Sequence, residues 1–209
     1  MAGYSSASPD GETWDATLPD AVSRTYHASL TVDDWNVLAT SVEGARPELL
    51  AGLRRHGAFR GGGYRNVAIG RVADVPAFFA ALRDDTARDP VLATALARVL
   101  PIDSRVRLDE QDPLPSLDAA VAALAPDVGS RSFFVRIERR GLHGTLHSSD
   151  VERTLGATLW RAIESAGGTP RVTFRDPDVV VAIETLGPLA GIALIDRALR
   201  TTYPFVRIR

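Results

Sequence analysis

The sequence lacks both cysteine and lysine, and all 24 basic residues among its 209 residues are arginines. The missing cysteine excludes disulfides, cysteine nucleophiles and cysteine-ligated zinc. The missing lysine excludes a Schiff-base lysine and a phosphate-loop lysine. Arginine keeps its charge and can bind phosphate through two N–H groups at once. The arginine side chains could therefore still contact nucleic acid.

Long apolar runs and a global excess of charge are also missing. No apolar run reaches the roughly 18 residues of a membrane span, and the first residues do not have the pattern of a secretory signal. We therefore expect a cytoplasmic protein with no membrane partner. The formal net charge is −2, so any nucleic-acid surface must be a local patch. The composition, 45% hydrophobic and 24% charged, is typical of a globular protein of one or two domains.

The most informative stretch is 132–150, SFFVRIERRGLHGTLHSSD. Its first half alternates apolar and polar residues with the period of a strand and ends at Arg139 and Arg140. A glycine-containing loop follows. Ser149 and Glu152 then form a capping-box pattern that predicts a helix start. The helix is predicted by apolar residues at helical spacing, namely Val151, Leu155, Leu159, Ala162 and Ile163.

A second run, 171–184, also has the alternating pattern of a strand. Val172 and Phe174 alternate as in a strand, and 176–178, DPD, predicts a turn. The nearly continuous apolar run 179–183 predicts a strand that is covered on both faces. The pattern of 189–200 fits a helix or a strand equally well. Before both runs, apolar residues at helical spacing predict a short helix over 117–124.

Three of these pieces resemble a THUMP domain, an RNA-binding module of tRNA-modifying proteins. They are FFVRIERRG at 133–141, SSDVERTLGATLW at 148–160 and FRDPDVVVAIE at 174–184. The resemblance implies a THUMP domain over 113–209, with a strand at 191–195. It also implies that this domain holds the acceptor end of tRNA.

The pattern of the first half predicts a flexible tail at 1–33, followed by a small domain of strands and helices over 34–112. Strands are expected at 35–42, 67–72 and 105–108. Helices are expected after Pro47, from Asp74, and from Asp89 through Leu92, Leu96 and Val99. The glycines of 59–65 predict a loop. This order suits a ferredoxin-like domain, so the predicted fold class is α+β.

Parts of the first half resemble the THUMP-containing adaptor proteins that assist tRNA cytidine acetylation. The pieces are NVLATS at 36–41, LRRHGAFRGGGYRNVAIGRV at 53–72 and LARVLPI at 96–102. The resemblance implies an RNA cytidine acetyltransferase as the partner enzyme.

Residues that could support catalysis are few. His143 and His147 are four residues apart, but a glycine lies between them and the run is typical of a loop. Ser148 and Ser149 are better explained by the helix start. The glycines of 60–65 do not form a dinucleotide fingerprint. We therefore expect no catalytic set, no metal site and no cofactor, and a protein that is not itself an enzyme.

Arginines near the ends of the predicted strands favour RNA binding instead. Guanidinium groups can contact phosphates and stack on unpaired bases, although each could equally be a solvated or ion-paired surface residue. The predicted RNA-binding residues are Arg136, Arg139, Arg140, His143, Arg171 and Arg175, extended by Arg60, Tyr64, Arg65 and Arg71.

The sequence therefore predicts a non-catalytic adaptor that binds tRNA and presents it to a modifying enzyme. The alternatives are a targeting subunit for a methyltransferase or thiolation enzyme, and a protein-interaction module that has lost RNA binding. No DNA partner is expected. Glutamate at positions 139 and 140 should weaken tRNA binding while leaving the fold intact.

Overall fold

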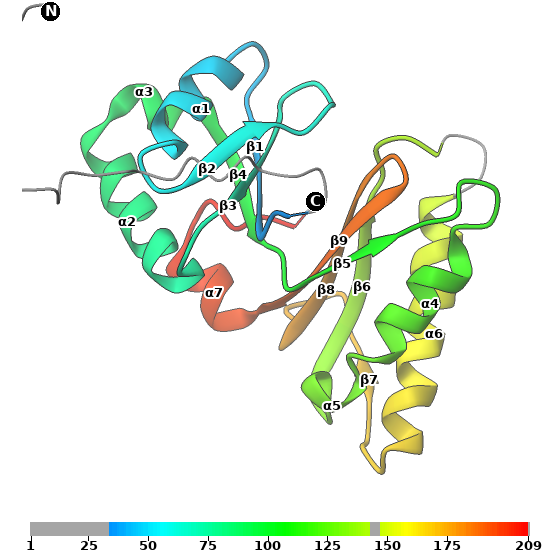
Figure 1. Cartoon of the computed structure of the whole chain (residues 1–209). Helices are drawn as coiled ribbons and strands as arrows, with labels where there is room; N and C mark the ends of the chain where they lie inside the picture. The colour runs from blue at the N-terminus through cyan, green and yellow to red at the C-terminus, as the bar shows by residue number, and fades with distance from the viewer. Residues whose placement is uncertain (1–33, 143–146, 209) are drawn as a thin grey trace, which may run out of the picture.

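The computed structural model describes residues 34–142 and 147–208, so the predicted tail and His143 lie outside the described residues. Two β-sheets lie at the centre, with helices on their outer sides (Figure 1). None of the described helices is long and apolar enough to cross a membrane. The mixture of helices with two separate sheets is consistent with the predicted α+β class.

The first sheet has the order β2-β3-β1-β4, and its paired strands are all antiparallel. Asp74 begins α2 as predicted, because its carboxylate accepts a hydrogen bond from the Ala77 N–H at 2.8 Å. The succession of elements, with α3 extending the second helix, is the β-α-β-β-α-β order of the predicted ferredoxin-like domain. That assignment stays a prediction here. The elements are β1 (Val37–Ser41), α1 (Arg46–Leu53), β2 (Ala58–Gly61), β3 (Val67–Arg71), α2 (Val75–Arg88), α3 (Pro90–Ala95) and β4 (Leu96–Pro101).

Two expectations for this half are wrong. The helix that begins after Asp89 ends at Ala95, and the residues predicted to continue it form β4. Leucine and alanine favour a helix locally, but β4 pairs with β1 along its length and buries its last four residues. The predicted glycine loop also contains a strand, β2, which pairs with β3.

The second sheet has the order β5-β9-β8-β6-β7. The predicted strands at 132–138 and 179–183 are present, and every residue of β8 is buried. The ambiguous stretch 191–195 is a strand and is part of β9. The elements are β5 (Ser104–Arg107), α4 (Leu114–Ala122), α5 (Ala125–Val128), β6 (Ser132–Glu138), α6 (Ser148–Ser165), β7 (Arg171–Val172), β8 (Val179–Leu186), β9 (Leu189–Asp196) and α7 (Arg197–Thr202).

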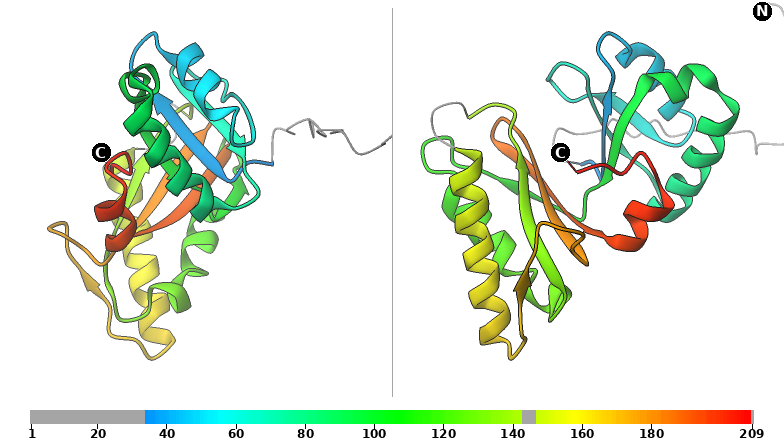
Figure 2. Two further views of the ribbon diagram at one scale, coloured as in Figure 1. Left: turned by 90° about the vertical axis from the view of Figure 1, so that its left-hand side faces the viewer. Right: turned by 180° about the vertical axis from the view of Figure 1, so that it is seen from behind.

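Helices α4 and α6 lie side by side over one face of the second sheet (Figures 1 and 2). The side chains of Phe133, Val135 and Ile137 point from β6 into this layer, as their alternation predicts. Strand β5 falls within the predicted first domain, 34–112, yet it pairs with β9 in the second sheet. The predicted domain division therefore remains a proposal.

The two sheets share a core. Phe134, Val180 and Ile195, on the face of the second sheet away from α6, belong to the same buried cluster as the interior of the first sheet. The C-terminal residues complete this cluster, and the Val99 N–H donates to the Phe205 carbonyl at 3.0 Å. The halves are therefore packed against each other and are not joined by the chain alone.

Candidate nucleic-acid interface

Strand β6 has an open edge beside the start of α6. Its neighbour on that side, β7, pairs only with Ser132 and Phe133. Further along the strand, the Ile137 N–H donates to a carboxylate oxygen of Glu152 at 3.0 Å. The predicted capping box is therefore wrong: His147 is the N-cap residue and makes no side-chain cap. The Glu152 carboxylate instead accepts the hydrogen bond of a β6 backbone N–H that β7 does not pair, and so satisfies that buried donor.

Arg136 belongs to the same local arrangement. Its guanidinium lies 3.2 Å from a Glu152 oxygen and 5.6 Å from the centre of the Phe134 ring. The Arg136 side chain is 39% exposed, although its Nε atom is buried. Arg136 thus stabilises the junction of β6 and α6 and remains at the surface.

Arg140 lies in the interior. Its side chain is 14% exposed, and one guanidinium nitrogen is 2.5 Å from Glu184 on β8. The other Glu184 oxygen is 2.8 Å from the buried Arg98 of β4. Burial raises the pKa of Glu184, and the adjacent Arg98 and Arg140 oppose that shift. These three residues, the buried ion triad, join the two halves.

The position of Arg140 changes one expectation. A glutamate there would place a second carboxylate beside Glu184 in a buried site, so the fold would not stay intact. Arg140 is therefore not proposed as an RNA contact.

Tyr64 also packs between the halves. Its ring lies against the cluster that contains Trp35 and Leu186. Its hydroxyl lies so close to Gly141 that an added Cβ there would be 2.6 Å from it. The stacking platform predicted at Tyr64 is therefore partly occupied by protein.

The remaining predicted residues of the first half have protein partners close to them in the structure. Arg60 donates to the Gly61 carbonyl, Arg65 pairs with Glu43 and Arg71 pairs with Asp34. The last two pairs are exposed, where ion pairs contribute little and exchange readily.

Arg171 and Arg175 lie on and just after β7. The Arg171 side chain is 72% exposed, and its nearest acidic contact is Asp178 at 3.8 Å. Arg175 is exposed. Arg139 lies at the exit of β6 and is partly exposed. Arg136 contacts Phe134 and Glu152, which line one surface feature, and Arg171 and Arg175 are neighbours in the chain of its lining residues Val172 and Phe174.

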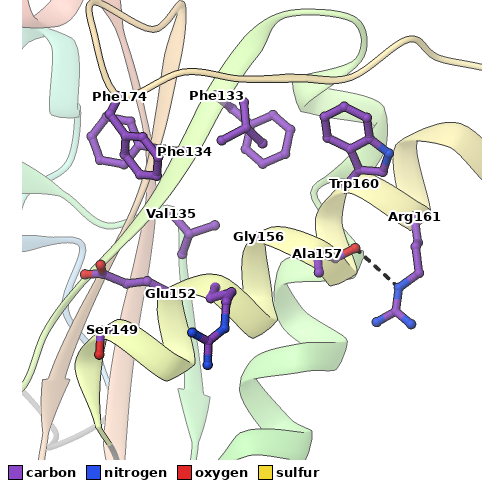
Figure 3. A pocket seen from close by; sticks show the side chains of 12 residues that line it. Phe133, Phe134, Val135, Ser149, Glu152, Gly156, Ala157, Trp160, Arg161 and Phe174 are labelled. Carbon is purple, nitrogen blue, oxygen red and sulfur yellow. Dashed lines mark hydrogen bonds between the residues drawn. The ribbon is translucent and has the colours of Figure 1, made fainter.

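That feature is a groove of about 810 Å³ between α6, β6 and the segment 172–174 (Figure 3). Phe134 and Phe174 lie together at one end and Trp160 lies at the other, with Phe133, Gly156 and Ala157 between them. Arg153 and Arg161 also line the groove, and both are exposed. We call this feature the α6 groove.

Sequence reasoning missed several residues of the α6 groove, among them Arg153, Trp160, Arg161 and Phe174. The helix pattern placed Trp160 and Arg161 on α6 without assigning them a role. The available signal was the aromatic Phe174 between two arginines, in RVTFRD at 171–176. Within the described residues, no group of three or more histidines and carboxylates could hold a metal ion.

No protein-family profile matches the sequence, and no curated protein matches it. Solved structures do match. TrmN from Thermus thermophilus is 24% identical with a TM-score of 0.57, over 77% of this chain and 45% of its own. PH1313 from Pyrococcus horikoshii is 13% identical with a TM-score of 0.53, over 78% of this chain and 54% of its own. SMU.472, a putative methyltransferase complexed with SAH, is 10% identical with a TM-score of 0.49, over 78% and 41%.

This chain thus spans about half the length of the structures that it matches. The likeness to TrmN and PH1313 shows the class of fold. One prediction is contradicted. We expected a protein that is not an enzyme, but TrmN, a tRNA methyltransferase, shares this fold.

Proposed function

We propose that this chain is the tRNA-binding part of a tRNA-modifying enzyme, with a ferredoxin-like domain over 34–112 and a THUMP domain over 113–209. The observation that carries the proposal is the α6 groove, an aromatic surface bordered by exposed arginines. Aromatic rings and guanidinium groups together are the chemistry that proteins use for single-stranded RNA. The resemblance to THUMP domains supplies tRNA as the RNA.

Positioning would be the contribution of this part to the reaction. Arg171 and Arg175 would bind phosphates beside the groove, and arginine can do so through two N–H groups at once. Holding the acceptor end at a fixed place raises the effective concentration of a distant nucleotide at the catalytic site. The buried ion triad would keep the two halves in one orientation while tRNA is bound.

Two catalytic activities are candidates for the whole enzyme. The sequence pieces in the first half resemble proteins that serve an RNA cytidine acetyltransferase. The fold likeness to TrmN favours a methyltransferase. Assaying purified enzyme on tRNA, with acetyl-CoA in one reaction and S-adenosylmethionine in the other, separates them by the group transferred.

The binding proposal is tested by titrating the purified chain with tRNA, with and without its 3′ CCA tail, at several salt concentrations. Tight binding that weakens on raising salt and on removing the tail is expected. Affinity equal to that of an unrelated acidic protein would refute the proposal. Salt-insensitive association with a protein, without RNA binding, would favour the interaction-module alternative.

A matched pair of variants localises the surface. R171E/R175E changes the charge beside the groove, and R83E/R88E makes the same change on α2 in the other half. The first pair should weaken tRNA binding and lower the salt slope by about 1.4–1.8, since each of the two lost phosphate contacts lowers it by roughly 0.7–0.9. The second pair should change neither quantity appreciably.

A further inference from the structure

The α6 groove leaves apolar surface uncovered at its Phe174 end. The Phe174 side chain is 74% exposed, and that of Val172 is 41% exposed. Phe174 rests on the ring of Phe134, with the ring centres 5.5 Å apart, so packing supports one side of the Phe174 ring. Midway along the groove, a Cβ added at Gly156 would meet no described atom within 4 Å (Figure 3). An open apolar groove of this kind is typical of a contact surface.

Positive charge surrounds this apolar surface. Arg153 and Arg161 line the groove, and both are exposed. The pair of Arg153 with Asp150 is solvent-exposed, so it contributes little and exchanges readily. Glu152 also lines the groove, but its carboxylate already accepts a hydrogen bond from the Ile137 N–H. The occupant that fits is therefore an aromatic or aliphatic group with several negative charges beside it.

The stretch 10–20 of this chain has that chemistry and lies outside the described residues. It is DGETWDATLPD, which contains four carboxylates and no basic residue, with Trp14 and Leu18 among them. Residues 1–33 contain five carboxylates and one arginine, a formal charge of −4, so the −2 of the whole chain leaves +2 on 34–209. Opposite charge and an aromatic side chain make this stretch complementary to the α6 groove.

The position of Trp14 in the chain allows it to reach the groove. Trp14 precedes Asp34, where the described part begins, by 20 residues. An extended chain of that length spans at most about 66–72 Å, whereas a compact unit of this size is roughly 40 Å across. The link therefore sets no geometric limit on docking. It also holds the stretch near the groove at an effective concentration on the order of 1 mM.

We propose that residues 10–20 dock in the α6 groove of the same chain, with Trp14 beside Phe174 and the carboxylates facing the arginines. The groove of a second copy fits less well, because two basic grooves repel each other. The docking is independent of the proposed function, whereas its consequence, competition with tRNA, rests on the proposed function. A stretch that binds with a Kd of about 0.1–1 mM would fill about half to nine-tenths of the grooves at that effective concentration. Docking would then lower the apparent affinity for tRNA by about 2-fold to 10-fold.

The absence of cysteine allows the docking to be measured in the full chain. T17C introduces a single thiol, which is labelled with a nitroxide, and the amide signals of isotope-labelled protein are compared before and after the nitroxide is reduced. The signals of Gly156, Ala157 and Val172 should be strongly broadened by the nitroxide. Those of α2 should keep their intensity.

Substitutions on both sides of the contact test its chemistry. W14A should remove most of the broadening, and W14F should retain it. R153E/R161E, in the groove, should also remove it, whereas the same charge change on α2, R83E/R88E, should not. Raising salt should reduce it, because the attraction is between exposed charges. W14A should bind tRNA about 2-fold to 10-fold more tightly than the wild type, as measured by anisotropy of labelled tRNA.

The outcomes separate the docking from the proposed function. Absent broadening, or broadening that W14A and R153E/R161E both leave unchanged, would overturn the docking whether or not tRNA binds. Broadening as predicted in a chain that binds no tRNA would uphold the docking and overturn the proposed function. Unchanged tRNA affinity in W14A, with the broadening lost, would overturn the competition alone. Broadening of chains without the nitroxide, when mixed with nitroxide-labelled chains, would assign the stretch to a second copy and overturn docking within one chain.

Discussion

Substitution of Glu184 by glutamine tests the buried ion triad. Glu184 is 2% exposed and lies within 2.8 Å of Arg98 and 2.5 Å of Arg140, whose side chains are 4% and 14% exposed. E184Q would leave two guanidinium groups in the interior without their shared carboxylate. Removing one partner of a buried ion pair costs about 3–5 kcal/mol. For a chain of this length, each kcal/mol lowers the melting temperature by roughly 2–4 °C, so we expect a fall of roughly 6–20 °C.

The assay is thermal and guanidinium unfolding followed by circular dichroism. D84N is the matched control, because Asp84 pairs with Arg83 where both side chains are about half exposed. That substitution should cost less than about 1 kcal/mol. The triple change R98M/R140M/E184L, which removes every charge of the triad, should cost less than E184Q alone. E184Q stability indistinguishable from that of D84N would refute the assignment of the triad as a joint between the halves.

Three further predictions concern single positions. Hydrogen bonds from the Ser132 hydroxyl and N–H lower the pKa of Asp178. The stability that the Asp178 carboxylate contributes is therefore present above the ordinary pKa of 3.8 and is lost as the pH falls through the lowered pKa. D178N should flatten the pH dependence of the stability measured by urea unfolding below about pH 4, and a pH profile equal to that of the wild type would count against this. G141A should destabilise by roughly 1–3 kcal/mol in thermal unfolding, because Gly141 has a φ of +83° and its new Cβ would meet the Tyr64 hydroxyl; wild-type stability would contradict it. G156A should stabilise α6 by about 0.5–1 kcal/mol, since nothing obstructs the added methyl group; a lower melting temperature would show that the space is filled.

Local pattern predicted several of the strands and helices of this fold. Alternation in β6 gave the correct inward face, and the continuous apolar run of β8 correctly indicated burial on both sides. The cap at Asp74 followed from one residue and its neighbours. Such signals are contained within one element, so the sequence can display them.

Sequence patterns within single elements do not reveal contacts between elements that are distant in the chain. The burial of Arg140 depends on Glu184, which follows 44 residues later, and on Arg98 in the other sheet. Glu152 matched a capping box by spacing, but the open edge of β6 provided a different hydrogen-bond donor. Strand β4 formed where leucine and alanine favoured a helix, because pairing with β1 outweighs local propensity.

The candidate site was partly predictable. Arg136, Arg171 and Arg175 were chosen for their positions on predicted strands; Arg136 contacts two lining residues of the groove, and the other two are near its lining residues in the chain. Phe174 was interpreted as a strand residue, yet β7 ends at Val172 and leaves the ring exposed. Pairing with β6 stops after two residues, and only the fold reveals this.

Ultraviolet crosslinking of the chain to tRNA, followed by mass spectrometry of the crosslinked peptides, tests the central claim most directly. Unpaired bases in contact with aromatic rings crosslink efficiently. We predict crosslinks from the unpaired 3′ end to peptides containing Phe174 and Trp160, and their loss when the CCA tail is removed. Crosslinks confined to α1 and α2, or none above background while tRNA remains bound, would contradict the assignment of the α6 groove as the tRNA-binding surface.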